Sequence, residues 1–198
     1  MVRRTLGALV LSVLALGCSH GKASPETTVD VGGGVTETVN GDETKKAFDL
    51  NGDGKPDAFE IYKTSKDEAG KPVAHLIRKE FDLNSDGKID MIRTYDEKEQ
   101  LQKESNDLDF DGKSDVVTYY EKGQRVKEER DFDAQGVAHT WVYYEKNQIA
   151  RKEKDTHNRG KPDYWEYWEN GVLDRIAFYK NGDGQVDFWE KNPDTQGK

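Results

Sequence analysis

The residues best suited to chemistry in this chain are aspartates and asparagines that stand two apart in short, glycine-containing loops. The clearest loop, 49–60, has oxygen-bearing side chains at positions 1, 3, 5, 9 and 12, with Gly54 at position 6. Alternate side chains of a tightly wound loop point inward, so their oxygens can surround one hard cation at about 2.4 Å. The glycine takes the sharp backbone turn that a side chain would resist. The spacing therefore predicts calcium coordination.

Three loops carry a nearly complete set of oxygen ligands, and one more carries a partial set. Each full set combines carboxylate or amide side chains with the backbone carbonyl of a lysine at position 7. The candidate metal ligands are Asp49, Asn51, Asp53, Lys55, Asp57 and Glu60, then Asp82, Asn84, Asp86, Lys88 and Asp90, and then Asp107, Asp109, Asp111, Lys113 and Asp115. The weaker metal ligands are Asn181, Asp183, Asp187 and Glu190. Hard oxygen donors without a histidine or cysteine cluster favour Ca²⁺ over zinc or copper.

Two further loops keep the glycine but lose ligands. The loop at 131–139 ends in His139, and the loop at 155–163 contains His157 and Arg159. Because the loop length persists without the ligands, a second interpretation is open for all the loops. In it, the Asp and Asn side chains are turn residues that accept hydrogen bonds from local backbone amides. Unpaired carboxylates crowded into one turn repel each other, and that cost favours a cation in the first three loops.

The loops recur with a fixed period, so they also mark the repeating unit of the fold. Their glycines stand at positions 54, 87, 112, 136, 160 and 184, the last four spaced by 24 residues. Each loop is followed by an aromatic and β-branched run, such as 164–169, which is typical of a strand. A two-residue turn such as Asn170-Gly171 and a more polar return strand come next. These segments are too short and too rich in Tyr, Trp, Val and Thr for the helices of an EF-hand.

The sequence therefore predicts an all-β fold, an antiparallel meander of about six 24-residue β-hairpin repeats with aspartate-rich loops between the hairpins. We expect about ten to twelve short strands, arranged as an elongated or curled single sheet or as a solenoid of hairpins. The second residue of each loop-following strand would stack in a ladder along one face of the sheet. These residues are Phe59, Ile92, Val117, Trp141, Trp165 and Trp189.

The start of the chain has the pattern of an export signal. Two arginines precede an apolar run of about a dozen residues, which is too short to span a membrane, so residues 1–17 are predicted to be a signal peptide. The stretch Leu14-Ala15-Leu16-Gly17-Cys18 resembles the lipobox of bacterial lipoproteins. That resemblance implies cleavage before Cys18 and acylation of this residue, for example with palmitate, as a membrane anchor. Cys18 is the only cysteine, so no disulfide can form within the chain.

Composition divides the remainder of the chain. Residues 18–46 contain almost no large apolar side chains, which predicts a lipidated, flexible tether. Residues 47–191 form the predicted repeat domain, and 192–198 a disordered tail. With 35% charged and 10% aromatic residues, the core should be thin and its stability should depend on bound cations. A net charge of −9 without a basic stripe excludes nucleic acid as a partner.

Two stretches of the repeat domain resemble known repeat families. Residues 48–57, Phe-Asp-Leu-Asn-Gly-Asp-Gly-Lys-Pro-Asp, resemble the strand–loop–strand calcium motif of FG-GAP and integrin-propeller repeats. They are also similar to the EF-hand-like loops of dockerins and thrombospondin type 3 repeats. Residues 165–173, Trp-Glu-Tyr-Trp-Glu-Asn-Gly-Val-Leu, are similar to MORN-type β-hairpin repeats. The combination implies calcium loops set into a single-layer meander that serves as an interaction surface.

These features together predict a calcium-binding, membrane-anchored lipoprotein that acts as a non-enzymatic scaffold of the cell envelope. We expect it in the outer membrane, facing the periplasm or the surface, with a protein or glycan partner. An envelope calcium sensor or buffer is the alternative. A hydrolase is less favoured because the histidines form no Ser-His-Asp or metal-protease arrangement. They are His20, His75, His139 and His157.

Overall fold

The computed structural model describes residues 26–133, 135–179 and 186–192, and within them the chain is all β with no α-helix. Accordingly, the described residues contain no helix with the length and apolar character needed to cross a membrane. The strands are β1 (Thr27–Gly32), β2 (Val35–Asn40), β3 (Glu43–Phe48), β4 (Ala58–Lys66), β5 (Pro72–Phe81), β6 (Met91–Tyr95), β7 (Leu101–Asn106), β8 (Val116–Glu121), β9 (Gln124–Arg130), β10 (Thr140–Glu145), β11 (Gln148–Lys154), β12 (Tyr164–Glu169), β13 (Val172–Phe178) and β14 (Phe188–Lys191).

The strands follow one another in the sheet in the order of the chain, which confirms the predicted antiparallel meander. The described part holds 14 strands, more than the ten to twelve expected. The chain divides into two compact units, residues 1–76 and 77–198, with the boundary inside β5. Each unit is described separately below.

The first unit begins earlier than the sequence predicted. Strands β1 to β3 occupy residues 27–48, so the expectation of a flexible tether up to residue 46 is wrong for that stretch. Apart from Phe48, the segment has no apolar side chain larger than Val, but the Thr and Val residues of β1 and β2 have high β propensity and several pair across the strands. Thr28 lies opposite Thr38, and their hydroxyl oxygens are 2.8 Å apart. In a sheet built on such pairs, strand formation does not require a large buried core.

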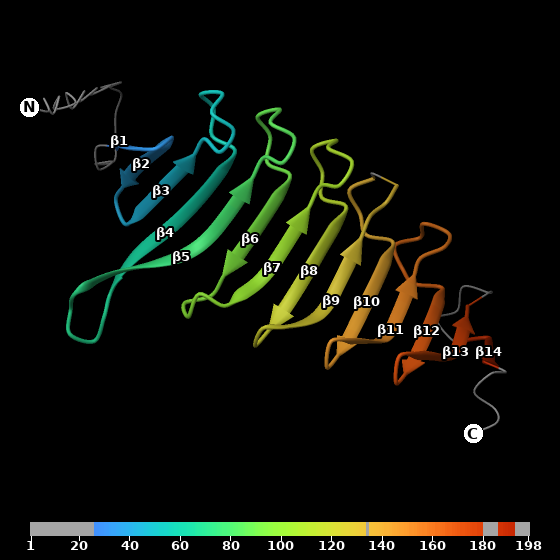
Figure 1. The fold of residues 1–198 in the computed structure, drawn as a ribbon. Coiled ribbons are helices and arrows are strands. Elements are labelled where there is room, and N and C mark those ends of the chain that lie inside the picture. Colours follow the sequence, from blue (N-terminus) through green and yellow to red (C-terminus); the bar gives the residue numbers. More distant parts are fainter. Residues whose placement is uncertain (1–25, 134, 180–185, 193–198) are drawn as a thin grey trace, which may run out of the picture. The chain divides into compact units, whose positions relative to one another are not determined.

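The second unit repeats a pattern of strand, tight turn, strand and loop (Figure 1). The turns after β8, β10 and β12 are two residues long, and Lys146, Asn147 and Asn170 have positive φ of 51°, 63° and 53°. Such values at the turn match the right-handed twist of the flanking strands. Because every second connection lies at the same edge, the loops after β5, β7, β9 and β11 form one row (Figure 1).

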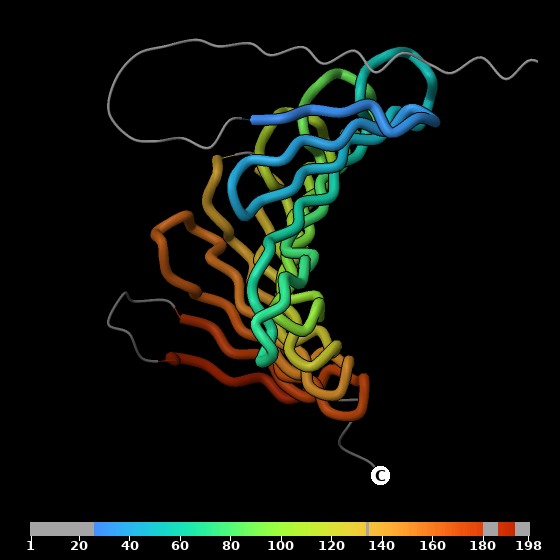
Figure 2. The backbone as a smooth tube through the Cα atoms, turned by 90° about the vertical axis from the view of Figure 1, so that its left-hand side faces the viewer, coloured from blue at the N-terminus to red at the C-terminus, as the bar shows by residue number. Residues whose placement is uncertain are grey.

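The core of the second unit is thin because the strands form a single layer (Figure 2). Val142 of β10 is fully buried, and its neighbours across the strands are Glu128 and Lys152. The long stems of such charged side chains can cover apolar surface in place of a second layer. Burial would raise the pKa of Glu128, but hydrogen bonds from Arg130 and Tyr144 lower it overall. The sheet therefore buries charges in pairs where a sandwich would bury apolar residues.

Five residues of the predicted ladder, Ile92, Val117, Trp141, Trp165 and Trp189, share one face of the second unit but do not stack directly. Trp141 and Trp165 both lie opposite Glu153, which stands on the intervening strand β11. Residues two strands apart are separated by about 10 Å. The repeat places one loop-following strand on every second position of the sheet, so a return strand always intervenes.

Candidate metal-binding loops

One backbone frame closes every loop. The amide of the residue at position 9 donates to the carbonyl of the residue just before the loop, as in Asp57 to Phe48 at 2.8 Å and Asp115 to Asn106 at 2.8 Å. His139, at the same position, donates to Arg130 at 3.0 Å. In the second unit the carbonyl at position 9 also accepts from the first amide of the next loop, and this joins consecutive loops along the edge. These bonds run from Asp107 to Asp90 (2.7 Å), from Asp131 to Asp115 (2.7 Å), from Asp155 to His139 (2.9 Å) and from Tyr179 to Asp163 (3.0 Å).

The aspartate at position 1 caps the glycine at position 6 in the five loops for which both residues are described. Its Oδ2 accepts from the glycine amide at 2.9 Å in Asp49–Gly54, 2.7 Å in Asp82–Gly87, 2.7 Å in Asp107–Gly112, 2.5 Å in Asp131–Gly136 and 2.6 Å in Asp155–Gly160. Burial would raise the pKa of Asp155, but the amides of Arg159, Gly160 and neighbouring residues lower it overall. The first aspartate is therefore part of the turn itself.

The aspartate at position 9 braces the start of the loop. Its Oδ2 accepts from the amide at position 2 in each of the three strong loops, in the pairs Leu50–Asp57 at 2.7 Å, Leu83–Asp90 at 2.6 Å and Leu108–Asp115 at 2.6 Å. The same oxygen lies 3.2–3.3 Å from the amide at position 3. Asp57, Asp90 and Asp115 are all buried. The aspartate at position 9 therefore stabilises the loop by joining its two ends.

The side chains at positions 3 and 5 each accept a hydrogen bond from the backbone amide two residues further on. Asp109 Oδ1 accepts from the Asp111 amide at 3.1 Å, and Asp111 Oδ1 accepts from the Lys113 amide at 2.8 Å. Asn51 and Asp53 repeat this arrangement in the first loop, as do Asn84 and Asp86 in the second. These hydrogen bonds fix the side chains of positions 3 and 5 against the loop backbone.

The third loop brings three carboxylates together. Asp107, Asp109 and Asp111 each offer an oxygen, and these oxygens all lie within 4.8 Å of one another. Asp107 is buried, and its Oδ1 accepts no hydrogen bond. A buried carboxylate oxygen without a partner is costly, and a bound cation would satisfy it. Oxygen donors at this spacing suit Ca²⁺, which binds at about 2.3–2.6 Å.

The remaining predicted ligands of the three strong loops are Glu60 and the lysines at position 7. Glu60 lies within β4, where it pairs opposite Lys46 and its carboxylate accepts from the Tyr62 hydroxyl at 2.7 Å. Lys88 and Lys113, named for their carbonyls, also place their ammonium groups 4.0 and 3.9 Å from the carboxylates of Asp86 and Asp111. The Lys55 amide donates to Asp53 Oδ1.

The weaker set near the end of the chain is described only in part. The amide of Asp187 closes its loop onto Phe178 at 3.0 Å, and Glu190 pairs opposite Ile176 in the ladder between β13 and β14. Asn181 and Asp183 lie outside the described residues, as does Cys18.

Sequence reasoning missed the cluster in the fourth loop. Asp131, Asp133 and His139 also place ligand atoms within 4.8 Å of one another. Measured against a calcium template, His139 counts as a lost ligand. A template that accepted a nitrogen donor at position 9 would have found this cluster from the spacing alone.

Comparisons with known proteins assign no family to the chain. No protein-family model and no curated protein matches it. Among solved structures, it is similar to a chain in the "Crystal structure of accessory secretory protein 1,2 and 3 in Streptococcus pneumoniae", with 17% sequence identity and a TM-score of 0.37. The likeness covers 51% of this chain and 18% of that chain.

Proposed function

We propose that this protein is a calcium-binding β-repeat scaffold in which cations stiffen the loop edge of a single-layer sheet. The observation that carries the proposal is the third loop, where Asp107, Asp109 and Asp111 converge and a buried oxygen of Asp107 has no hydrogen-bond partner. Three carboxylates at this spacing repel one another, and a divalent cation would convert that repulsion into attraction.

The thin core gives such a cation a structural task. A ligand that binds only the folded state stabilises it in proportion to its concentration relative to its dissociation constant. Because the loops of the second unit are hydrogen-bonded in a row, stiffening one loop would also support its neighbours. Calcium sites in exported modules bind at about 10⁻⁴–10⁻³ M, which suits structural support better than signalling.

The exposed faces of the sheet give the scaffold its binding surface. In the second unit, tyrosines on the loop-following strands lie opposite lysines and arginines on the return strands. The row runs Lys103, Tyr119, Lys127, Tyr143, Arg151, Tyr167, Arg175. The cations lie 4.2–5.8 Å from the ring centroids along this row. Aromatic rings and cations in alternation suit a protein or glycan partner.

The cellular setting is part of the same proposal. We infer that acylated Cys18 anchors a non-enzymatic scaffold in the bacterial cell envelope, most simply in the outer membrane. The support is the lipobox-like sequence that precedes this cysteine. Labelling with a radioactive fatty acid in a bacterial host would test the anchor, with Cys18→Ala as the variant that should lose the label.

A calcium titration tests the central claim. The mature chain with Cys18→Ser should bind calcium by native mass spectrometry and melt at a higher temperature in calcium than in chelator. Asp107→Asn should lose one ion and part of the calcium-dependent stabilisation. Asp96→Asn is the matched control, since Asp96 caps a tight turn by accepting from the amides of Lys98 and Gln100.

The control variant should keep every ion. Equal melting curves with and without calcium would refute the scaffold proposal and leave the loops as metal-free turns. Sub-micromolar affinity with a large change of shape would instead support the sensor alternative.

A further inference from the structure

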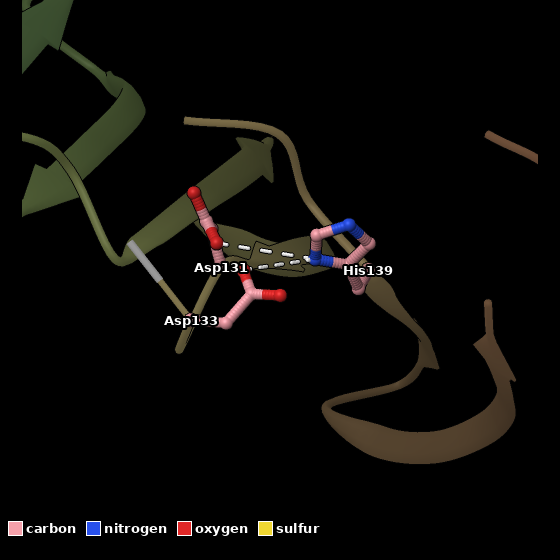
Figure 3. Close-up of side chains that lie close together, drawn as sticks. All are labelled: Asp131, Asp133 and His139. Carbon is pink, nitrogen blue, oxygen red and sulfur yellow. Dashed lines mark ion pairs between the residues drawn. The ribbon is translucent and has the colours of Figure 1, made fainter. Parts of the chain in front are cut away.

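We propose that the fourth loop, 131–139, is a separate site for a borderline transition-metal cation such as Zn²⁺, bound by Asp131, Asp133 and His139. The three side chains converge from the two ends of the loop (Figure 3). His139 Nδ1 lies 3.2 Å from Asp133 Oδ1 and 3.9 Å from Asp131 Oδ1. Two ligand atoms of one tetrahedral zinc ion lie roughly 3.4 Å apart, so small adjustments would centre an ion between them.

Two atoms of this cluster are buried without a hydrogen bond. They are Asp131 Oδ1 and His139 Nδ1, which face each other across the loop (Figure 3). The Asp131 side chain is only 6% exposed, so water cannot easily satisfy it. Its other oxygen is already used, because Asp131 Oδ2 accepts from the Gly136 amide. Buried polar atoms are nearly always hydrogen-bonded, so two such atoms without a hydrogen bond, 3.9 Å apart, indicate a missing ligand.

The next loop fixes which nitrogen of His139 can bind a metal. Asn158 Nδ2 donates to Gln135 Oε1 at 2.8 Å, and this turns the Asn158 carbonyl oxygen toward His139 Nε2 at 2.7 Å. Nε2 must therefore carry the proton that it donates to Asn158. In the neutral ring, Nδ1 then presents a lone pair to two carboxylates, an arrangement that only a cation or a second proton can stabilise. Metal-binding histidines commonly donate their other ring N–H to an oxygen in this way.

The donor set differs from that of the calcium loops. Position 5 is Gln135, whose side-chain oxygen is engaged by Asn158, and position 9 is His139 in place of aspartate. Two carboxylates and one imidazole nitrogen suit zinc and similar borderline cations, whereas Ca²⁺ prefers six to eight oxygens. Asp133 is 47% exposed, so the remaining coordination positions are open to water. The two clusters share no ligand, so zinc binding in the fourth loop can be measured separately from calcium binding in the third.

Zinc titration of the full mature chain, with Cys18→Ser and in excess calcium, tests the site. Imidazole ¹H–¹⁵N spectra should show zinc on Nδ1 of His139 while Nε2 stays protonated, with one zinc bound by calorimetry. His139→Asn should abolish this event and leave calcium binding unchanged. Asn158→Ala should weaken zinc about tenfold, because the imidazole loses its orienting partner.

His157→Asn is the matched control, because His157 lies in the neighbouring loop beside Asp163. This variant should retain the zinc event. The proposal is overturned if zinc binding survives in His139→Asn or is lost in His157→Asn. A proton on Nδ1 at saturating zinc, meaning a protonated imidazole only, would overturn it as well. Melting curves in chelator establish that each variant is folded, so that a lost site is not confused with a lost fold.

Discussion

The third and fourth loops of the second unit have the same backbone frame and different ligands. In both, the first aspartate caps the glycine, at 2.7 Å for Asp107–Gly112 and 2.5 Å for Asp131–Gly136. The glycines have φ of 92° and 80°. The third loop adds carboxylates at positions 3, 5 and 9, whereas the fourth has one carboxylate, one amide and one imidazole there.

This difference shows that the residues that fold the turn are distinct from those that select the cation. Position 1 and the glycine recur where the other ligands change, so they suffice to fold the loop. Positions 3 and 5 can then vary, position 9 can exchange its bracing aspartate for His139, and the side chains at these positions decide which cation fits. The edge of one sheet can in this way carry sites of different selectivity on a single frame.

The largest expected effect comes from giving the fourth loop the ligand side chains of the third. Gln135→Asp combined with His139→Asp should create one additional calcium site and remove the zinc event. We expect a gain in calcium affinity of roughly a hundredfold, about 2.7 kcal/mol, because two carboxylates are added. Native mass spectrometry counts the ions. His139→Asn alone should add no calcium, and an unchanged ion count in the double variant would show that the frames are not equivalent.

The shared frame predicts equal costs for losing either glycine. Gly112→Ala and Gly136→Ala should each destabilise the protein by about 1–2 kcal/mol, since a side chain at positive φ is strained. An added Cβ would meet nothing within 4 Å at either site, so the cost is conformational. Denaturant unfolding in chelator measures it without contributions from metal. A neutral Gly136→Ala would mean that the fourth loop does not rely on the same turn.

The fifth loop, 155–163, tests the frame where positions 3 and 5 hold no acids. Burial would raise the pKa values of Asp155 and Asp163, but local hydrogen bonds lower both: Asp155 accepts from backbone amides, and Asp163 from Thr156 and His157. The unfolded chain takes up these protons near pH 3.9, above the folded values. Their stabilisation is therefore complete above that pH and is lost as the pH falls through the folded pKa values.

Asp155→Asn should remove part of this acid dependence. It should also lower the free energy of unfolding by about 1 kcal/mol at neutral pH, because an amide oxygen accepts hydrogen bonds more weakly than a carboxylate. Urea unfolding at a series of pH values between about 2 and 7 measures both effects. If the free energy of unfolding falls equally steeply below pH 4 in the variant and the parent, Asp155 does not contribute to the acid dependence.

The sequence predicts those features that depend on short-range spacing. The hairpin at Asn170-Gly171 and the loop closures follow from local turn chemistry, and the structure confirms the meander they imply. The strands at 27–48 could not be predicted from hydrophobicity, because Phe48 is their one apolar side chain larger than Val. The role of His139 depends on Asn158, nineteen residues later, and only the folded loop edge brings the two together.

The smallest expected effect comes from position 4 of the loops. Phe110 has φ of 65°, a region that bulky side chains rarely adopt, whereas Asn158 holds the same position in the fifth loop with φ of 53°. Phe110→Asn should stabilise the protein by about 0.5–1 kcal/mol, because asparagine tolerates this backbone conformation. Phe110 is 41% exposed, so little buried area is lost. Thermal melts in chelator measure the gain, and a loss of stability would mean that the ring packs on the loop edge and that the third loop is held by more than its shared frame.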